Sequence, residues 1–536
     1  MLLGSAAFAM AQGDATAELR KELDALRGDY EKRINQLESR IRELEAAPSA
    51  PKPSAPAVKR VPADEEMTAA QERENQARAT QQAARMAVDE RFQEDTETRQ
   101  IARRPDAESM LAERIEDVLE GYLDITGYFR AGYGRSSEGG PLQAFGAPGV
   151  AKYRLGNEAE NYGELAFAKT FYPAGAFAGG RGMGANDPVA RMNYRMSFYN
   201  PYDNYGSASE TDFASPELWG SLANVVPGMP DAKIWAGNRF YRRHDIHIND
   251  FYFWDMSGGG AGIEDITLGH GKLAFAWIGD GAESAIYSRL GESDPLNVAG
   301  FSKTNFDLRY YDWDFFGGMG EVGLTYSRAD SGMDSNGKQA DDADGLALTL
   351  VRTDQGFLDE NSLHKLSLQV GNGPAKTFTS GFDTFIDETG TYIRPDPDES
   401  WRFRATDQVV VKPCEAFSIG SALVYQYTEY GEDTPTQQWV SGGVRPIWHI
   451  TDTFSLAFEG GVDWLSRTQN GDGGTVGKLT LAPQVSLGSE FFSRPVLRAF
   501  VTYATWSDGL QGEVAGPDYA GQNSGWSWGV QMESWW

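Results

Sequence analysis

A period-two alternation of apolar and polar residues runs along the chain from about residue 121 to the C-terminus. In its first stretch, apolar residues take the odd-numbered positions and mostly polar residues the even-numbered ones: Leu123, Ile125, Phe129, Ala131 and Tyr133 against Asp124, Thr126, Tyr128 and Arg130. The same pattern recurs at 495–503 and at 526–532. Because neighbouring side chains of a β-strand point to opposite faces, the pattern predicts strands with one apolar and one polar face.

The breaks between these strands are of two kinds. Residues 412–415 and 451–453 are typical of tight turns, whereas 329–345 is a long loop rich in Gly, Asp and Ser. Short turns at one end and long loops at the other are typical of an outer-membrane β-barrel whose apolar face meets lipid. A soluble β-sandwich also alternates, but it rarely reaches about 400 residues. No run approaches the roughly eighteen apolar residues of a membrane-spanning helix, which disfavours a helical membrane protein.

The region before the strands follows a different pattern. Between residues 14 and 46, large apolar residues recur mostly three or four positions apart: Leu19, Leu23, Leu26, Tyr30, Ile34, Leu37, Ile41 and Leu44. This spacing predicts an α-helical coiled coil with one stutter, and a lone amphipathic helix is the alternative. Residues 1–13 are apolar and contain Ala9-Met10-Ala11, which fits the remnant of a secretory signal, with a disordered tail as the alternative.

Two further segments separate the coiled coil from the strands. Residues 47–63 are rich in Pro and Ala, so we expect an extended linker and a domain boundary there. Residues 64–120 are rich in Ala, Glu, Gln and Arg and predict a polar helical spacer that cannot build much core. The strand-rich domain then spans 121–536.

Composition and motifs exclude several classes of function. The chain has 48 Lys and Arg against 77 Asp and Glu, a net charge of -29, which argues against nucleic acid as a partner. Its single cysteine, Cys414, cannot form an internal disulfide, and no Cys/His cluster predicts a metal site. Asp245 and Asp250 are the best candidates for paired catalytic carboxylates, but on an uninterrupted strand they would face opposite sides. We therefore expect no enzyme, no catalytic residue and no cofactor.

Four stretches of the strand-rich domain resemble the maltoporin family. The longest is IWAGNRFYRRHDIHINDFYFWDMSGGGAG from Ile234, which is similar to the maltoporin segment that leads into an inward-folded constriction loop. The others are KYRLGNEAENYGEL from Lys152, SRPVLRAFVTYATW from Ser493 and WGVQMESWW from Trp528. Together they bracket the domain from about residue 121 to Trp536.

The resemblance implies a fold, a location and an activity. The fold is all-β: an 18-stranded antiparallel transmembrane β-barrel, preceded here by the N-terminal α-helical coiled-coil extension. Homotrimers of such barrels lie in the outer membrane of Gram-negative bacteria, in contact with its lipid, and pass maltose and maltodextrins by facilitated passive diffusion. The extension would then lie in the periplasm, and two roles stay open for it: reinforcement of the trimer, or contact with the cell wall.

The resemblance also implies two rows of residues along the pore. The first is an aromatic slide for sugar rings, which maps onto Tyr128, Tyr162, Phe492 and Trp536, with Phe492 in place of the usual tryptophan. The alternation puts the first three on the polar, lumen-facing side, whereas Trp536 shares the parity of the lipid-facing Trp528, so its place rests on resemblance alone. Two further slide positions have only candidates: Tyr202 or Tyr205, and Phe357 or Leu363.

The second row is a track of ionisable residues opposite the slide. It maps onto Arg130, Arg154, Glu164, Arg243, Asp245 and Asp250, and Tyr252 matches the tyrosine that narrows the constriction. The alternative for Arg243, Asp245 and Asp250 is that they only fasten the constriction loop to the wall by ion pairs.

The sucrose-porin branch is the second candidate, because it also carries an N-terminal coiled coil. That branch replaces bulky or charged residues at the constriction, whereas Arg243, Tyr252 and Asp255 here keep the maltoporin pattern. The first external loop departs from enteric maltoporins, which can hold a disulfide where this chain has Ala144 and Ala159. A maltodextrin channel is favoured; a sucrose-type or broader carbohydrate porin, and a general porin that tethers the membrane to the periplasm, are the alternatives.

Overall fold

The computed structural model describes residues 123–173, 187–200, 212–281, 302–333, 339–381, 385–386, 392–393, 399–431, 436–468 and 471–536. The chain divides into two compact units, residues 1–63 and 64–536, and every described residue belongs to the second. The expected signal remnant, coiled coil, linker and spacer lie outside the described residues. No helix in the described part is long and apolar enough to cross a membrane.

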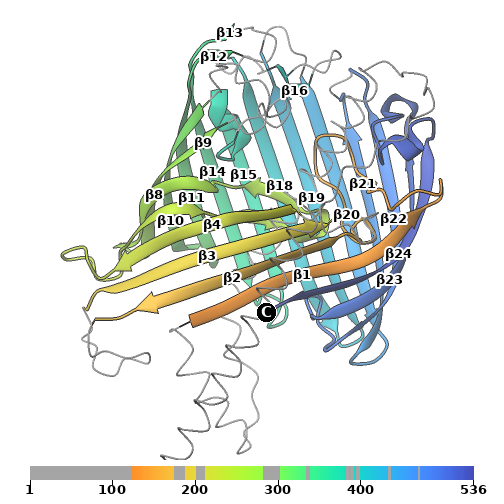
Figure 1. Cartoon of the computed structure of the whole chain (residues 1–536), viewed down its shortest axis with the longest axis horizontal. Helices are drawn as coiled ribbons and strands as arrows, with labels where there is room; N and C mark the ends of the chain where they lie inside the picture. The colour runs from red at the N-terminus through yellow and green to blue at the C-terminus, as the bar shows by residue number, and fades with distance from the viewer. Residues whose placement is uncertain are drawn as a thin grey trace, which may run out of the picture. The chain divides into compact units, whose positions relative to one another are not determined.

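Eighteen antiparallel strands form one closed sheet (Figure 1). They are β1 (Leu123–Ser136), β2 (Asn161–Phe171), β3 (Val189–Asn200), β4 (Asp212–Ala223), β5 (Lys233–Arg239), β8 (Gly258–Leu268), β9 (Gly271–Gly281), β10 (Ser302–Phe315), β11 (Gly318–Ala329), β14 (Ala343–Gln355), β15 (Leu363–Asn372), β18 (Trp401–Cys414), β19 (Phe417–Glu429), β20 (Gln437–His449), β21 (Phe454–Leu465), β22 (Gly474–Ser486), β23 (Val496–Trp506) and β24 (Ser524–Trp535). Pairing of β1 with β24, with Tyr128 opposite Trp535, closes the barrel. The expected 18-stranded antiparallel barrel is confirmed.

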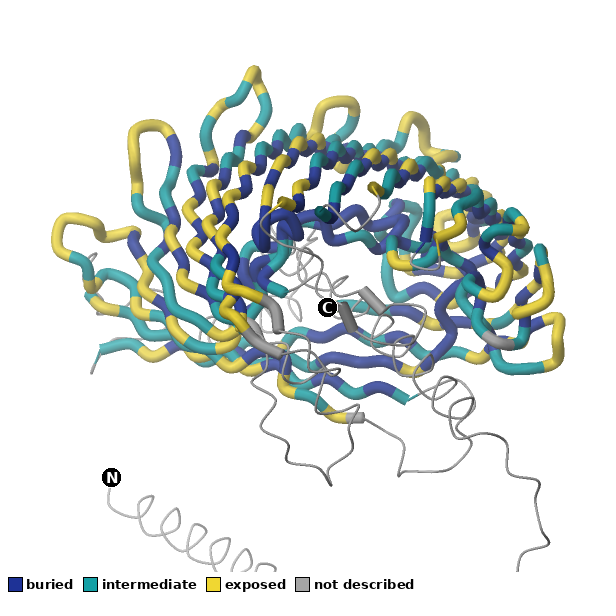
Figure 2. The backbone as a smooth tube through the Cα atoms, turned by 90° about the horizontal axis from the view of Figure 1, so that it is seen from above, coloured by how far each residue is buried: buried dark blue, intermediate teal, exposed yellow. Residues whose placement is uncertain are grey.

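The two faces of the wall have opposite character, and buried and exposed residues alternate along the strands (Figure 2). On β23, Leu497 is 55% exposed on the outside, and its neighbour Arg498 is 7% exposed on the inside. On β24, Trp526, Trp528, Val530 and Met532 are exposed. The outer face is therefore apolar and the inner face polar, as the alternation predicts and as a barrel in lipid requires.

Several neighbouring strands are joined by short connections, as between β10 and β11. Only Phe316 and Gly317 join these two strands, and both have positive φ, 55° and 85°. A two-residue hairpin turn of type I′ needs positive φ at both positions because its twist then matches that of the strands.

Longer connections fold into the barrel and line it. We call residues 137–160 the first inner loop, 240–257 the second, 373–381 the third, and 487–495 the inner turn. The second inner loop contains β6 (His244–Ile246), the short 3-10 helix η2 (His247–Asn249) and β7 (Phe251–Trp254), and the third contains η3 (Gly373–Thr377).

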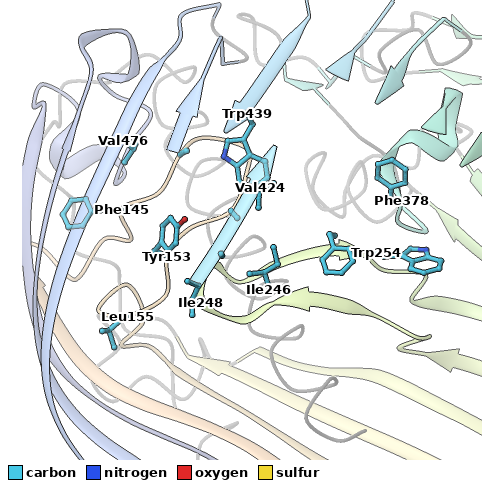
Figure 3. Packing of buried hydrophobic residues seen from close by; sticks show 14 of the residues in the cluster. Phe145, Tyr153, Leu155, Ile246, Ile248, Trp254, Phe378, Val424, Trp439 and Val476 are labelled. Atoms are coloured by element: carbon cyan, nitrogen blue, oxygen red, sulfur yellow. The ribbon is translucent and has the colours of Figure 1, made fainter. Parts of the chain in front are cut away.

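These inner segments contribute to a buried apolar cluster inside the barrel (Figure 3). Tyr153 of the first loop, Ile248 and Trp254 of the second and Phe378 of the third all belong to it, together with Trp439 of the wall. Burial of such large side chains holds the loops against the wall, because each fully buried apolar side chain contributes about 1.5–3 kcal/mol. The lumen is narrowed by packed protein.

Tyr153 shows how the wall accommodates a loop. Its ring lies directly on Gly443 of β20 and Gly461 of β21, where any Cβ atom would overlap it. These two glycines are register partners, and the Tyr153 hydroxyl lies 3.0 Å from the Ser441 hydroxyl. On the other face of the same strands, Gly442 and Gly460 line an outward-facing hollow of about 600 Å³.

Candidate functional site

Three tyrosines on the first three strands form a row on the inner wall. Tyr128 of β1, Tyr162 of β2 and Tyr199 of β3 are all buried and pack together. The ring centroids of Tyr128 and Tyr162 are 6.0 Å apart, and Tyr162 is the register partner of Tyr199. Tyr199 was not among the expected residues. The alternation could have found it, because it shares an inward face of β3 with the buried polar residues Arg195 and Ser197.

The terminal tryptophan is placed differently from the expectation based on resemblance. Trp536 is 45% exposed, and its ring covers Gly127, which shares the outward face of β1 with Leu123 and Ile125. Trp535 instead pairs with Tyr128 and packs against the tyrosine row. The structure therefore brings Trp535 to the row in place of Trp536, because adjacent residues of a strand face opposite sides. The parity of Trp536 with Trp528 already pointed outward.

Phe492 lies in the inner turn, before β23 begins, so its parity with Arg498 does not determine its direction. Its ring is half-buried and meets the His247 ring edge-on at 5.2 Å and the Phe491 ring at 4.9 Å. His247 belongs to the second inner loop. The inner turn and the second inner loop therefore meet inside the barrel, through aromatic rings.

Charged side chains accompany the tyrosine row. Arg130 forms ion pairs with Glu158, at 2.8 Å, and with Glu160. Arg154 lies 3.1 Å from Glu158, and its guanidinium also donates to the Tyr128 hydroxyl at 3.3 Å. The structure thus brings Arg130 and Arg154 next to the aromatic row, and both are buried.

Glu164 is the acidic member of this group on β2. It accepts a hydrogen bond from the Tyr162 hydroxyl and pairs with Arg195 of β3 at 2.7 Å. Arg195 also pairs with Glu217 of β4 at 2.6 Å. Alternating charges therefore run across three neighbouring strands, which keeps the buried groups compensated.

The remaining expected residues belong to the second inner loop. Arg243 lies over the rings of Phe240, at 3.7 Å, and Tyr252, at 5.0 Å, and its guanidinium is 3.8 Å from the Asp255 carboxylate. Tyr252 and Asp245 are buried. Tyr252 thus lies buried inside the barrel, beside the Arg243 guanidinium.

Asp250 connects the second inner loop to the first. Its carboxylate lies 3.9 Å from Nε of Arg154, and the Arg154 amide donates to the Ile248 carbonyl at 3.0 Å. Asp245 and Asp250 are separated by η2, and Asp250 has a φ of 55°. The uninterrupted strand assumed for these two carboxylates is therefore not present, because a helical turn separates them.

The pKa of Glu158 in the first inner loop and the pKa of Asp250 in the second shift in opposite directions. Burial acts to raise the pKa of Glu158, but the guanidiniums of Arg130 and Arg154 outweigh it and hold the pKa at about 2. Burial raises the pKa of Asp250 to about 6, even though Arg154 opposes the shift. Glu158 stays charged across the physiological range, and Asp250 changes its charge near the acidic end of that range.

Side chains from several strands of the wall hold the second inner loop in place. Arg404 of β18 donates to the Phe253 carbonyl at 2.8 Å, and the guanidinium of Arg309 of β10 lies 3.6 Å above the Trp254 ring. His244 Nε2 lies 3.0 Å from the Glu321 carboxylate of β11. Contacts to three strands fix the loop across the lumen.

For the two slide positions with alternative candidates, the structure describes only one of the two pairs. Tyr202 and Tyr205 lie outside the described residues. Phe357 is exposed in the turn between β14 and β15, whereas Leu363 is buried at the start of β15. Of the two alternatives, Leu363 is therefore the one on the inner side. Within the described residues, no group of three or more His, Cys, Asp or Glu could hold a metal ion.

A closed barrel with an apolar outer face, a polar inner face and loops folded into its lumen defines a porin channel of the outer membrane, and this is a channel rather than an enzyme. The model of the LamB porin family matches residues 123–536. The chain belongs to the LamB porin family, which confirms the resemblance to maltoporins.

Several solved structures align with this chain at low identity. OprB of Pseudomonas putida is 10% identical with a TM-score of 0.41, over 80% of this chain and 97% of that one. The anion-selective porin from Comamonas acidovorans is 10% identical with a TM-score of 0.40, over 77% and 99%. OccAB1 of Acinetobacter baumannii is 10% identical with a TM-score of 0.42, over 78% and 98%.

Proposed function

We propose that the channel passes maltose and maltodextrins by facilitated passive diffusion, with sugar rings moving along the tyrosine row. The observation that carries the proposal is the row of rings on the inner wall: Tyr128 and Tyr162 lie 6.0 Å apart with their planes tilted by 55°, Tyr199 packs against them, and buried arginines lie beside them. One face of a glucose ring is a patch of C–H groups that packs on an aromatic face, and its hydroxyls need hydrogen-bond partners at the edge. The tyrosine row supplies the aromatic rings, and the arginines beside it supply hydrogen-bond donors.

Transport needs contacts that are individually weak and repeated. Successive rings allow a sugar chain to move from one contact to the next, and neighbouring charged groups exchange hydrogen bonds with its hydroxyls without forming a deep free-energy minimum. Tyr252 and Arg243 of the second inner loop narrow the path, which favours a slim glucan chain over a branched or bulkier sugar. The proposal includes a homotrimer with the N-terminal extension in the periplasm.

The test is single-channel current through the purified protein in planar bilayers, titrated with maltotriose and then with sucrose. We expect concentration-dependent block by maltotriose and weaker block by sucrose. Stronger block by sucrose would assign the channel to the sucrose-type alternative. Absence of block by either sugar would leave only a general porin and would contradict the proposal.

A further inference from the structure

Glu533 of β24 occupies the centre of the buried charge network, although no resemblance drew attention to it. It is buried, and among the described residues its two carboxylate oxygens contact the side chains of Tyr128, Arg154, Arg494 and Arg498. Oε1 accepts from the Tyr128 hydroxyl at 3.1 Å and from Arg154 at 3.2 Å. Oε2 accepts from Arg494 at 3.0 Å and from Arg498 at 3.3 Å.

These four partners come from different parts of the chain. Tyr128 belongs to the first strand and Arg154 to the first inner loop. Arg494 belongs to the inner turn, two residues after Phe492, and Arg498 belongs to β23. The same carboxylate therefore contacts the tyrosine row, the arginines beside it and the turn that carries the phenylalanines.

We propose that Glu533 is the positioning residue that sets both the aromatic row and the arginines of this channel, and that its charge contributes to ion selectivity. The sugar part rests on the proposed function; the ion-selectivity part stands without it. Three arginines converge on a single carboxylate, so loss of its charge leaves a local excess of positive charge beside the pathway.

Arg494 connects Glu533 to the inner turn, because it belongs to that turn and donates to the Glu533 carboxylate. Its guanidinium also lies 4.0 Å from the centre of the Trp535 ring, so the side chain lies between the carboxylate and the aromatic face. Release of this arginine removes one of the contacts that hold the inner turn, in which the Phe492 ring meets the His247 ring; another is the ion pair of Glu490 with Lys412 at 2.7 Å. The position of Phe492 in the lumen therefore depends on Glu533, although the two side chains need not touch.

The test uses the full-length chain in planar bilayers, with two readouts. The zero-current potential in a KCl gradient gives the ratio of chloride to potassium permeability without any sugar, and titration with maltotriose gives the block. For Glu533→Gln we expect the ratio to move toward chloride by about fivefold, because one buried charge is lost close to the path. We expect maltotriose block to weaken by about tenfold.

Arg494→Met separates positioning from general damage. It breaks the same contact from the other side, so maltotriose block should weaken to a similar degree, but the permeability ratio should move toward potassium because a cation is lost. The double variant should lose less block than the sum of the single effects, because the second change removes a contact that is already broken. Glu533→Asp keeps the charge and should keep the wild-type permeability ratio.

Glu264→Gln is the control, since it removes a buried carboxylate that pairs with a single arginine, Arg239 at 3.0 Å, on β5 and β8. Its maltotriose block should equal that of the wild type.

Two outcomes would overturn the proposal. In the first, Glu533→Gln leaves both the permeability ratio and the maltotriose block unchanged. In the second, Glu533→Gln and Arg494→Met move the permeability ratio in the same direction. If the wild type shows no block, the proposed function fails, and opposite shifts of the ratio alone then decide the role of Glu533. If Glu533→Gln does not fold, Arg494→Met and Glu533→Asp carry the test.

Discussion

Tyr128 belongs to the tyrosine row and also forms hydrogen bonds with the charged side chains beside it. Its ring lies 6.0 Å from that of Tyr162, tilted by 55°, and its hydroxyl donates to Glu533 and accepts from Arg154. A tyrosine held in this way keeps its ring in one orientation, because the hydroxyl is fixed by charged partners. A rigid aromatic face contributes more to a weak stacking contact than a mobile one, since less rotamer freedom is lost on binding.

Removal of the neighbouring ring tests the stacking surface directly. We expect Tyr162→Ala to weaken maltotriose block by about tenfold, or about 1.4 kcal/mol, because one stacking face disappears. Ion conductance should stay close to that of the wild type. Tyr162→Phe, which keeps the ring and loses only the hydroxyl contact to Glu164, should retain most of the block. Equal block by the alanine variant and the wild type would remove Tyr162 from the slide.

Tyr252 offers a test of the constriction. Its side chain is buried inside the barrel beside Arg243, so Tyr252→Ala should widen the lumen and raise single-channel conductance by roughly half. Tyr252→Phe should conduct like the wild type because it retains the ring. Unchanged conductance in Tyr252→Ala would place the narrowest point elsewhere.

Asp250 predicts a pH dependence. Burial raises its pKa to about 6, so the folded protein disfavours the charged form, which is present mainly above that pH. As pH falls from 7 to 5, the carboxyl becomes neutral and Arg154 keeps its charge. We therefore expect the zero-current potential to shift toward chloride preference over this range. Asp250→Asn should lack that part of the shift, and an identical pH profile in both proteins would contradict the assignment.

At the scale of elements, the alternation predicted most of what the wall shows. It assigned the correct faces to β1, β23 and β24, because lipid on one side and water on the other impose a period of two along every strand. It also pointed Trp536 outward, against the resemblance, and the structure agrees with the alternation. The number of strands came from the resemblance, because alternation in one strand carries no information about closure.

Residues outside the regular strands were harder to predict. Phe492 lies in a turn and Asp250 follows a helical turn, so counting alternate positions does not give their directions. Glu533 was missed because its role depends on partners far along the chain: Tyr128 lies 405 positions away. Contacts of this kind form when the barrel closes, so the pattern of residues along a single strand does not predict them.

The first inner loop supplies a test at this scale. We expect Gly461→Val to push the Tyr153 ring from the wall and to lower the free energy of unfolding by about 2 kcal/mol, because the new side chain would overlap the ring. Gly460→Val is the matched control, since its side chain would enter the outward hollow and meet only the flexible Leu479. Urea unfolding in detergent measures both. Similar losses in the two variants would show that Tyr153 does not depend on Gly461.

At the scale of the whole molecule, we expect the barrel and the predicted N-terminal coiled coil to have separable roles. The site residues named above all lie within 123–536, whereas the coiled-coil pattern covers 14–46. Deletion of 14–46 should therefore leave conductance and maltotriose block unchanged. It should lower the temperature at which trimers dissociate on a gel, because a coiled coil adds contacts between subunits. A changed block would show that the extension reaches the pore, and an unchanged dissociation temperature would favour a cell-wall contact instead.

The closing of the barrel by β1 and β24 has a consequence for how the channel matures. Tyr128 and Arg130 stand on one side of that seam, and Gln531, Glu533 and Trp535 stand on the other. Contacts between distant parts of a chain form late in folding, because a large loop must close before they are made. A barrel with an open seam would lack the contacts between β1 and β24, among them the hydrogen bond from Tyr128 to Glu533. We therefore expect the proposed sugar path to form only in the step that closes the wall, so that a half-assembled barrel would conduct ions without distinguishing between sugars.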